Sequence, residues 1–479
     1  MKISELQPER VFYYFEKLCE IPHGSGNTRQ ISDFCVATAK KLGLSCKQDK
    51  LNNVVIVKEA TDGYEDADTV MLQGHLDMVC EKTADCQKDM EKEGPEIYIS
   101  GDEVRARDTT LGGDDGIAVA MILAILEDET LEHPRLEAVF TVDEEIGLLG
   151  AEALDVSRLQ AKKMINLDSE EEGIFTVSCA GGNTLEGKLP IDGECYSGEY
   201  CELRICGLLG GHSGAEIHLG RANSNVLMGR VLNAIRKECR IRLLSIDGGS
   251  KDNAIPLDTV AEFVCEDKNK VIEIVEKLRD IVINEYRTSD PDIRMIVSFK
   301  NCEEKICYNE DSTEKMITLL RCLPNGVQKM SLDIENLVQT SLNLGVVKTE
   351  KNEMTVSFCV RSSVDSERCD LNDEIDALLS YLGGTVEIRG AYSGWAYKED
   401  SPLRDCMCRV FEKDYGKAPV VEAIHAGLEC GLFAGKMPGL DCVSVGPDLQ
   451  HVHTVNECMS IPSVQRVYQF ICHVLTMLK

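Results

Sequence analysis

The sequence predicts an α/β protein in which a central mixed sheet flanked by helices is interrupted by an inserted α+β domain. The first part of the chain alternates helical and strand patterns, the middle changes to longer and more polar elements, and the last part returns to the first style. At 479 residues the chain also exceeds the usual size of one hydrophobic core. We predict a first domain made of residues 1–183 and 390–479, with the insertion over 184–389.

The first domain opens with two amphipathic helices, predicted over 8–21 and 28–42. Four short apolar runs follow, each typical of a buried strand that ends in polar residues: NNVVIVKE, TVMLQGHLD, LEAVFTVDEE and KKMINLDSE. Helical GIAVAMILAILED lies between the second and the third. Ligands of open α/β sheets bind at the carboxyl ends of the strands, so we expect a site where these runs end.

The insertion combines strand patterns with long amphipathic helices. Strands are predicted in YCELRICG, TVAEFVCED and MTVSFCVRSS, and helices in SNVLMGRVLNAIRKE, KVIEIVEKLRDIVINEY and LNDEIDALLSYL. Turns such as IDGE and IDGGSKDN separate them. After the insertion, the helical tail SIPSVQRVYQFICHVLTML ends the chain.

The charge and the apolar runs exclude several classes of protein. A net charge of −31 argues against nucleic acid or an anionic membrane as partner, because such surfaces need clustered Lys and Arg. No stretch approaches the roughly 20 apolar residues of a membrane span. The N-terminus MKISELQPER is too polar and acidic for a signal peptide, so we expect a cytoplasmic protein.

The 22 cysteines are scattered through apolar stretches without CxxC pairs. Examples are Cys206, Cys265, Cys322 and Cys359. We interpret them as small buried thiols in a reducing compartment rather than as a disulfide framework.

His75 is the first candidate for a metal ligand. It lies in QGHLDMV at a strand end, where residues two apart project to the same face, so Asp77 could accept a hydrogen bond from the second imidazole nitrogen. Metal-binding histidines favour such a partner. A strand-end histidine with a satisfied hydrogen bond is the alternative.

Three acidic clusters end elements of the same domain. In DTTLGGDDGIAVA, Asp114 precedes a helix whose dipole favours a carboxylate, although an N-cap would look the same. FTVDEEIG supplies Glu144 and Glu145, whose side chains should point in different directions. MINLDSEE supplies Asp168, for which a solvated acidic turn is the alternative.

Several carboxylates at one sheet edge would repel one another unless cations neutralise them. Neutral imidazole and carboxylate oxygen together form a ligand set suited to zinc. The residues therefore favour the hypothesis of a two-metal hydrolase.

Six ordered motifs resemble the aminoacyl-histidine dipeptidase family, also called Xaa-His or cytosolic non-specific dipeptidases. They are GHLDMVC, TTLGGDDGIA, FTVDEEIGLLGA, NLDSEE, GLLGGHSG and SVGP with HVHTVNE, and the resemblance spans essentially the whole chain. The family belongs to a group of zinc exopeptidases that includes carnosinases, aminotripeptidases and acylamino-acid deacylases. The resemblance implies their fold, with the insertion as a lid and dimerisation domain.

The resemblance also implies a set of ligands for two zinc ions in each subunit. Asp114 matches the bridging carboxylate, His75 and Asp168 complete one zinc site, and Glu145 and His453 complete the other. A site rich in carboxylates could also accept manganese or cobalt.

Further roles follow from the same resemblance. Glu144 matches the general base, which takes a proton from the metal-bound water and passes it to the leaving amine. Asp77 matches the residue that orients His75. In related structures the peptide bond after the bridging aspartate is cis, which here is Asp114–Asp115.

The resemblance also implies four candidates for contact with substrate, three in the insertion and His425 in the last part of the chain. His212 matches a histidine that related dimeric enzymes place in the partner subunit's active site to stabilise the oxyanion, although a turn histidine between glycines is the alternative. Asn253 and Arg361 resemble lid residues, with a strand-end salt bridge as the alternative for Arg361. His425 lies in a family-like stretch and is expected to line the substrate pocket. A homodimer through the lid is implied.

The resulting hypothesis is a metallopeptidase that hydrolyses unblocked dipeptides, including the Xaa-His type. An aminotripeptidase or N-acyl-amino-acid deacylase on the same scaffold is the alternative among enzymes. A non-catalytic zinc-binding interaction protein is the alternative from another class, but the presence of Glu144 argues against it.

Overall fold

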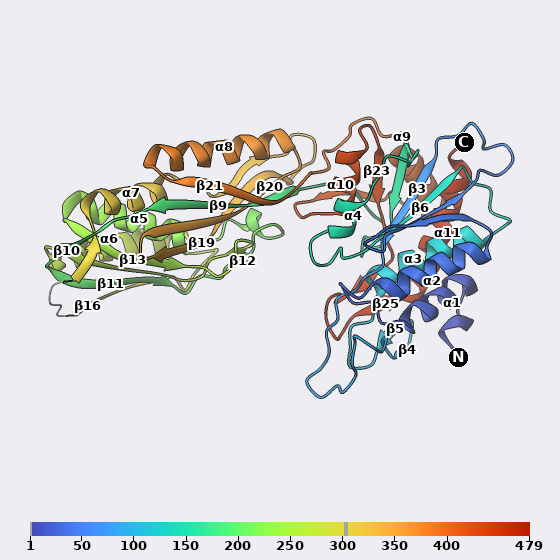
Figure 1. Ribbon diagram of the computed structural model, residues 1–479, viewed down its shortest axis with the longest axis horizontal. Helices are drawn as coiled ribbons and strands as arrows, with labels where there is room; N and C mark the ends of the chain where they lie inside the picture. The colour runs from blue at the N-terminus through green and yellow to red at the C-terminus, as the bar shows by residue number, and fades with distance from the viewer. Residues whose placement is uncertain (1, 301–304) are drawn as a thin grey trace. The chain divides into compact units, whose positions relative to one another are not determined.

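The computed structural model describes residues 2–300 and 305–479, which divide into two compact units (Figure 1). The first unit contains the chain up to Cys179 with residues 395–423 and 428–479, and the second contains residues 180–394 and 424–427. The main limits lie within a few residues of those predicted. Residues 424–427, which we assigned by sequence to the first domain, group with the second unit.

The first unit is built on an eight-stranded mixed sheet. In spatial order its strands are β1 (Ser45–Gln48), β2 (Val54–Lys58), β6 (Leu136–Thr141), β3 (Val70–His75), β7 (Lys163–Asn166), β23 (Asp441–Ser444), β8 (Ile174–Cys179) and β22 (Val420–Ile424). β3 runs parallel to both β6 and β7, and β7 runs parallel to β23. The predicted mixed sheet is confirmed, and three of the four apolar runs lie side by side in parallel.

Seven α-helices accompany this sheet: α1 (Glu9–Cys19), α2 (Arg29–Lys41), α3 (Gly113–Glu127), α4 (Leu149–Ala153), α9 (Pro402–Tyr415), α10 (Glu429–Lys436) and α11 (Ile461–Met477). A 3-10 turn, η1 (Ile3–Glu5), precedes α1. The sequence of α3 is apolar on every side, and the helix is accordingly buried between α1, β3 and α11. Packing on all sides fixes the position of its N-terminal end, which carries Asp114.

A smaller sheet of four strands also belongs to the first unit. Its order is β24 (Leu449–Gln450), β25 (Cys458–Ser460), β5 (Glu103–Ala106) and β4 (Ile97–Ser100). β24 and β25 form an antiparallel hairpin. The loop of this hairpin, residues 451–457, carries His453.

The second unit contains a nine-stranded antiparallel sheet. The path runs through β16 (Arg294–Lys300), β11 (Glu199–Cys206), β15 (Thr259–Cys265), β13 (Ile241–Gly248), β19 (Val338–Glu350), β20 (Glu353–Ser362), β9 (Gly181–Pro190) and β21 (Thr385–Tyr392), with β18 (Gly326–Met330) beside β19. Two short pairs complete its strands: β10 (Gly193–Tyr196) with β17 (Lys305–Tyr308), and β12 (Gly211–His212) with β14 (Ala254–Ile255).

Helices α5 (Ser224–Glu238), α6 (Lys268–Glu285), α7 (Glu310–Cys322) and α8 (Asp365–Leu382) lie along one face of the larger sheet (Figure 1). The 3-10 turn η2 (Ile217–Leu219) precedes α5. Side chains of β20 alternate between buried and half-buried, as expected for a sheet covered on one face. The inserted α+β domain is thus confirmed as a fold.

Most described cysteines are buried free thiols, and none of them forms a disulfide. Cys206 and Cys265 are buried, as predicted. The prediction is wrong for Cys322, which is exposed at the end of α7, and Cys359 is only half-buried. Within the described ranges, no helix is both long and apolar enough to cross a membrane.

Candidate metal centre

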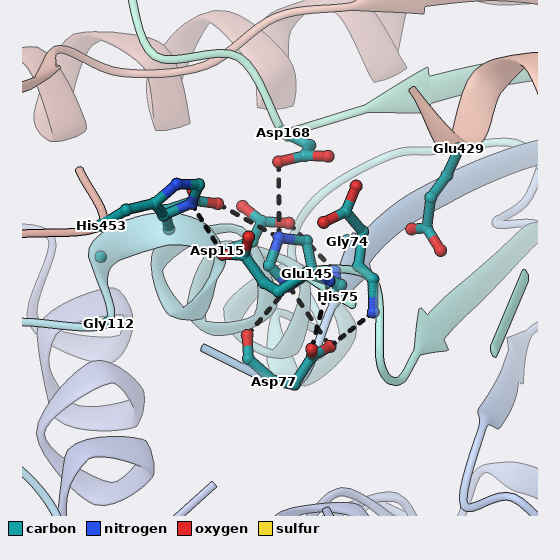
Figure 2. Close-up of polar contacts among 12 residues, drawn as sticks. Gly74, His75, Asp77, Gly112, Asp115, Glu145, Asp168, Glu429 and His453 are labelled. Atoms are coloured by element: carbon teal, nitrogen blue, oxygen red, sulfur yellow. Dashed lines mark hydrogen bonds and ion pairs between the residues drawn. The ribbon is translucent and has the colours of Figure 1, made fainter. Parts of the chain in front are cut away.

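The candidate metal centre lies where three parallel strands of the first unit end. His75 is the last residue of β3, Glu144 and Glu145 follow β6, and Asp168 follows β7. Figure 2 shows the side chains of His75, Glu145 and Asp168 gathered at this edge, together with His453. These four side chains therefore meet at the carboxyl ends of the strands, and the assignment of that edge as a site remains a prediction.

Asp114 lies at the middle of this group. Its Oδ1 atom lies 3.1 Å from Nε2 of His75, and its Oδ2 atom lies 3.1 Å from Nε2 of His453. The two oxygens of one carboxylate thus face two different imidazoles. This is the arrangement required of a carboxylate that bridges two cations.

The other two carboxylates complete the two groups. Oδ1 of Asp168 lies 3.6 Å from Nε2 of His75, and Oε1 of Glu145 lies 2.9 Å from Nε2 of His453. Two ligand atoms of a tetrahedral zinc ion, each about 2.0–2.2 Å from the metal, are separated by about 3.3–3.6 Å. The observed separations are close to that value, and the donor set of imidazole and carboxylate suits zinc.

The structure also gathers a residue that the sequence did not single out as a ligand. His75 forms one possible metal-holding group with Asp114 and Glu145, and another with Asp115 and Asp168. However, Oδ2 of Asp115 accepts the backbone N–H of His75 at 3.1 Å. We therefore assign Asp115 to holding the end of β3. The bond that joins Asp114 to Asp115 is cis, as expected from the resemblance.

The ionisation of the ligands shows how strongly the site favours positive charge. Burial and, to a smaller extent, the nearby carboxylates of Asp114 and Glu145 raise the pKa of Asp168 to about 6, although the contact with His75 opposes the rise. The hydrogen-bonded carboxylates of Asp114 and Glu145 raise the pKa of His453 to about 10. Burial opposes a charged His75, yet the carboxylates of Asp114 and Asp168 hold its pKa well above the usual range. Metal cations would supply the same compensation for these carboxylates.

Asp77 faces His75 with both its backbone carbonyl and its carboxylate. Nδ1 of His75 faces the backbone carbonyl of Asp77 at 2.9 Å, whereas the carboxylate lies at 3.7 Å. β3 ends at His75, so the alternation expected of a strand does not continue to Asp77. The carboxylate instead accepts the hydroxyl of Ser25 at 2.8 Å and the backbone N–H groups of Glu144 at 3.1 Å and Glu145 at 3.4 Å.

Glu144 lies beside the candidate ligands but takes no part in the close pairs around Asp114. Burial raises the pKa of Glu144 to about 9, against the favourable charge of His75, and the carboxylate of Asp168 adds to the rise. Its side chain is therefore a basic carboxylate next to the ligands. That environment is suited to proton transfer.

The candidates in the insertion lie in the second unit, where two of them share a loop region. His212 in β12 pairs with Ala254 in β14, and the backbone N–H of Ser213 donates to the carbonyl of Asn253 at 2.9 Å. Nδ1 of His212 accepts the N–H of Ala215 at 3.0 Å, so the proton of a neutral imidazole lies on Nε2. His212 is exposed and can donate that proton to a ligand.

Arg361 and His425 form a second group in the same unit. Arg361 in β20 pairs with Ser341 in β19, whose hydroxyl lies 2.7 Å from Nε2 of His425. Arg361 Nε and His425 Nδ1 are buried and have no hydrogen-bond partner within the part of the chain that the structure describes. Burial and the Arg361 guanidinium lower the pKa of His425 to about 3. The group offers a guanidinium and a neutral imidazole to a carboxylate ligand.

Three of the remaining histidines make ordinary hydrogen bonds or ion pairs away from Asp114. Nδ1 of His23 faces a backbone carbonyl at 2.6 Å and that of His133 faces another at 2.8 Å, while His473 pairs with Asp414 at 2.8 Å. His451 occupies the same loop as His453 but makes no close contact with Asp114 among the described residues.

Sequence reasoning missed two buried carboxylates near the centre. Glu429 accepts hydrogen bonds from Thr141 at 2.7 Å and from Gln73, and Figure 2 shows it beside Gly74. Glu457 accepts backbone N–H groups of the loop that carries Asp114. Neither ends a predicted strand, although Glu457 is the last residue of the motif HVHTVNE, which could have drawn attention to it.

Comparison with known proteins places this chain in a family. Residues 71–477 match the model of peptidase family M20/M25/M40. The chain belongs to that family. The cytosol non-specific dipeptidase of Escherichia coli is 37% identical over 478 residues, which cover 99% of this chain and 98% of the relative.

Two solved structures share the fold of this chain. The aminoacylhistidine dipeptidase from Vibrio alginolyticus superposes with a TM-score of 0.95 at 34% identity, covering 100% of this chain and 98% of the other. The aminopeptidase PepT from Bacillus cereus superposes with a TM-score of 0.58 at 15% identity, covering 99% of both chains. The latter likeness shows the fold alone. The family predicted from the motifs is therefore confirmed.

Proposed function

We propose that this M20-family protein is a dinuclear zinc dipeptidase that hydrolyses unblocked dipeptides, including the Xaa-His type. The observation that carries the proposal is the position of Asp114, whose two oxygens each lie 3.1 Å from a different histidine. The names of the E. coli and Vibrio relatives support a dipeptide substrate.

In this proposal one ion is held by His75, Asp114 and Asp168, and the other by Asp114, Glu145 and His453. When bound, such ions supply Lewis acidity that polarises a carbonyl and makes water more acidic. Manganese or cobalt would suit the same carboxylate-rich set. A bridging carboxylate offsets part of the repulsion between two cations.

Glu144 is the proposed general base. It takes a proton from the attacking water and returns it to the amine that leaves when the peptide bond breaks. The contacts of Asp77 support this role, because its carboxylate holds the backbone N–H groups of Glu144 and Glu145. Asp77 would thereby fix a proton acceptor beside a metal ligand.

Residues of the second unit are proposed to recognise the substrate. His212 can donate from Nε2 to the oxygen that becomes negative during attack. Arg361 and His425 offer unpaired, buried nitrogen atoms to a carboxylate, which in a dipeptide is the free C-terminus. Asn253 would assist through the loop that it shares with the His212 turn.

We further propose a homodimer that forms through the second unit and a cytoplasmic location. The dimer is implied by the role that the family resemblance gives to His212, and the location is supported by the name of the E. coli relative. A small dipeptide is then the principal partner. The net charge of −31 argues against nucleic acid as a partner.

The test is hydrolysis by the zinc-reconstituted protein of β-Ala-His, Ala-His, Gly-Leu, N-acetyl-Ala-His and Ala-Ala-Ala, with a chelator control. We expect cleavage of the three free dipeptides only, and loss of it with chelator. Preference for the acetylated peptide would instead indicate a deacylase, and preference for the tripeptide would indicate an aminotripeptidase. Activity that persists without metal would overturn the metallopeptidase assignment.

A further inference from the structure

Glu457 makes a set of contacts that the proposed chemistry does not use. Its side chain is buried, and its carboxylate accepts four successive backbone N–H groups. Oε2 accepts those of Leu111 at 2.7 Å and Gly112 at 3.2 Å, and Oε1 accepts those of Gly113 at 2.8 Å and Asp114 at 3.3 Å. No Lys or Arg among residues 2–300 and 305–479 forms an ion pair with it, so backbone dipoles alone compensate its charge.

The two glycines of the sequence GGDD allow this carboxylate to approach. Gly112 caps α3 with a φ of +73°, a left-handed conformation, and supplies no side chain as a cap. A Cβ atom on Gly113 would lie 3.2 Å from Oε1 of Glu457. Glu457, 343 residues from Asp114 in sequence, therefore serves as the acceptor at the N-terminus of α3.

Glu457 also closes the loop that presents His453. The loop, residues 451–457, is held by the backbone N–H of Glu457, which donates to the carbonyl of Thr454 at 3.1 Å, and by the Thr454 hydroxyl, which donates to His451 at 2.7 Å. His453 adopts a φ of +61° within it. A non-glycine residue keeps this conformation where its surroundings enforce it.

Asp114 is thus held at two points by one loop. Its backbone N–H donates to Glu457 at 3.3 Å, and its Oδ2 faces Nε2 of His453 at 3.1 Å. Asp114 therefore contacts both Glu457 and His453, and these two residues belong to the same loop. A shift of the Glu457 side chain would change the separation of the bridging carboxylate and the histidine.

We propose that Glu457 is a positioning residue of the metal centre, which fixes Asp114 relative to His453 and preorganises the site for its cations. The proposal rests on the proposed function, because it takes Asp114 and His453 as ligands. Residues outside the ligand set that orient the ligands commonly contribute a factor of about 10–100 in metal affinity. Here the effect should be larger for the ion bound by His453, since that ligand shares the loop with Glu457.

The competing explanation is that Glu457 only caps α3 and does not affect metal binding. A control variant at another buried carboxylate distinguishes this explanation from the proposal. Glu137 is also a buried carboxylate, and it accepts the backbone N–H groups of Gln160 at 3.0 Å and Ala161 at 3.1 Å. It lies near the start of β6, whereas the ligands follow the end of that strand. Glu137→Gln therefore replaces one oxygen of a buried carboxylate with an NH2 group away from the metal centre, although Glu137, unlike Glu457, also pairs with Arg135 at 2.6 Å.

The experiment measures zinc affinity of the full-length protein by competition with a chromophoric chelator, alongside thermal unfolding of the metal-free form. We expect both Glu457→Gln and Glu137→Gln to unfold at lower temperature without metal. Only Glu457→Gln should bind zinc more weakly, by about 10–100-fold for one of the two ions. Gly113→Ala crowds Oε1 of Glu457 but keeps the Glu457 carboxylate, and it should also weaken zinc binding. It provides a second test of the proposal if Glu457→Gln does not fold.

Equal zinc affinities of the wild type and both Glu457→Gln and Gly113→Ala would overturn the proposal. An equal loss in Glu137→Gln would overturn it as well, because the effect would then follow from general destabilisation. A wild-type protein that does not bind two zinc ions would contradict the proposed function itself. That outcome is visible in the same titration before any variant is compared.

Discussion

The carboxylate of Asp77 accepts a hydrogen bond from the backbone N–H of Glu144 at 3.1 Å. The same carboxylate accepts the next N–H, that of Glu145, at 3.4 Å, while the backbone carbonyl of Asp77 faces His75. Asp77 therefore orients the proposed general base, Glu144, and two proposed metal ligands, Glu145 and His75. It does so by connecting the ends of β3 and β6.

Replacing Asp77 with Ala should lower kcat by about 10–100-fold, because the loop of Glu144 and Glu145 loses its two acceptors while His75 keeps its carbonyl partner. The measurement is steady-state hydrolysis of Ala-His with zinc in excess. Ser25→Ala, which removes only the hydroxyl that donates to Asp77, is the control and should retain most of the activity. Equal losses in the two variants would show that the Ser25 contact, rather than the loop, matters.

Replacing Glu144 with Gln should abolish turnover, since an amide cannot accept the proton of the attacking water, and losses of about 10²–10⁴-fold are typical for such a group. Zinc content, measured by atomic emission, should remain near two ions for each subunit because Glu144 is not in the proposed ligand set. A variant that keeps wild-type activity would remove Glu144 as the base. Loss of one ion would instead make it a ligand.

Replacing His212 with Ala should lower kcat by about 10²–10³-fold with a smaller change in KM, because an oxyanion donor acts mainly in the transition state. His473→Ala provides a comparison at a histidine paired with Asp414 on α9. Kinetics of the His212 variant that match those of the His473 variant would leave His212 as a turn residue. A rise in KM alone would assign it to substrate binding.

His425 should make the second unit sensitive to acid. Burial and the Arg361 charge lower its pKa to about 3, whereas an unfolded histidine has a pKa of about 6.5. Below about pH 6.5 the unfolded state therefore binds more protons than the folded state, and stability falls as the pH falls toward 3. The slope from one such group approaches 1.4 kcal/mol for each pH unit, to order of magnitude.

Hydrogen exchange of β19 and β20, followed by mass spectrometry between pH 6 and pH 4, can measure this effect. His425→Gln should show a smaller loss of opening free energy with acid than the wild type. Ser341→Ala, which breaks the 2.7 Å contact with His425 but keeps the imidazole, should retain the acid sensitivity. Parallel slopes for wild type and His425→Gln would mean that His425 is accessible to protons in the folded state.

The sequence by itself determined which residues could form the site. Short apolar runs in the sequence end at His75 and just before Glu144 and Asp168. The strands β3, β6 and β7 coincide with these runs to within a few residues. Parallel strands place their carboxyl ends at one edge, so the meeting of these side chains followed from local pattern alone. The sequence likewise predicted that a helix follows Asp114, and α3 is that helix.

Only the tertiary structure decided how these residues connect. Asp114 is 39 residues from His75 and 339 from His453, and no local pattern fixes such separations. The roles of Asp77 and Glu457 depend on backbone N–H groups of irregular loops, where strand alternation no longer directs the side chains. Backbone donors are present at almost every residue, so the sequence cannot show which carboxylate they will meet, whereas packing brings one particular carboxylate within reach.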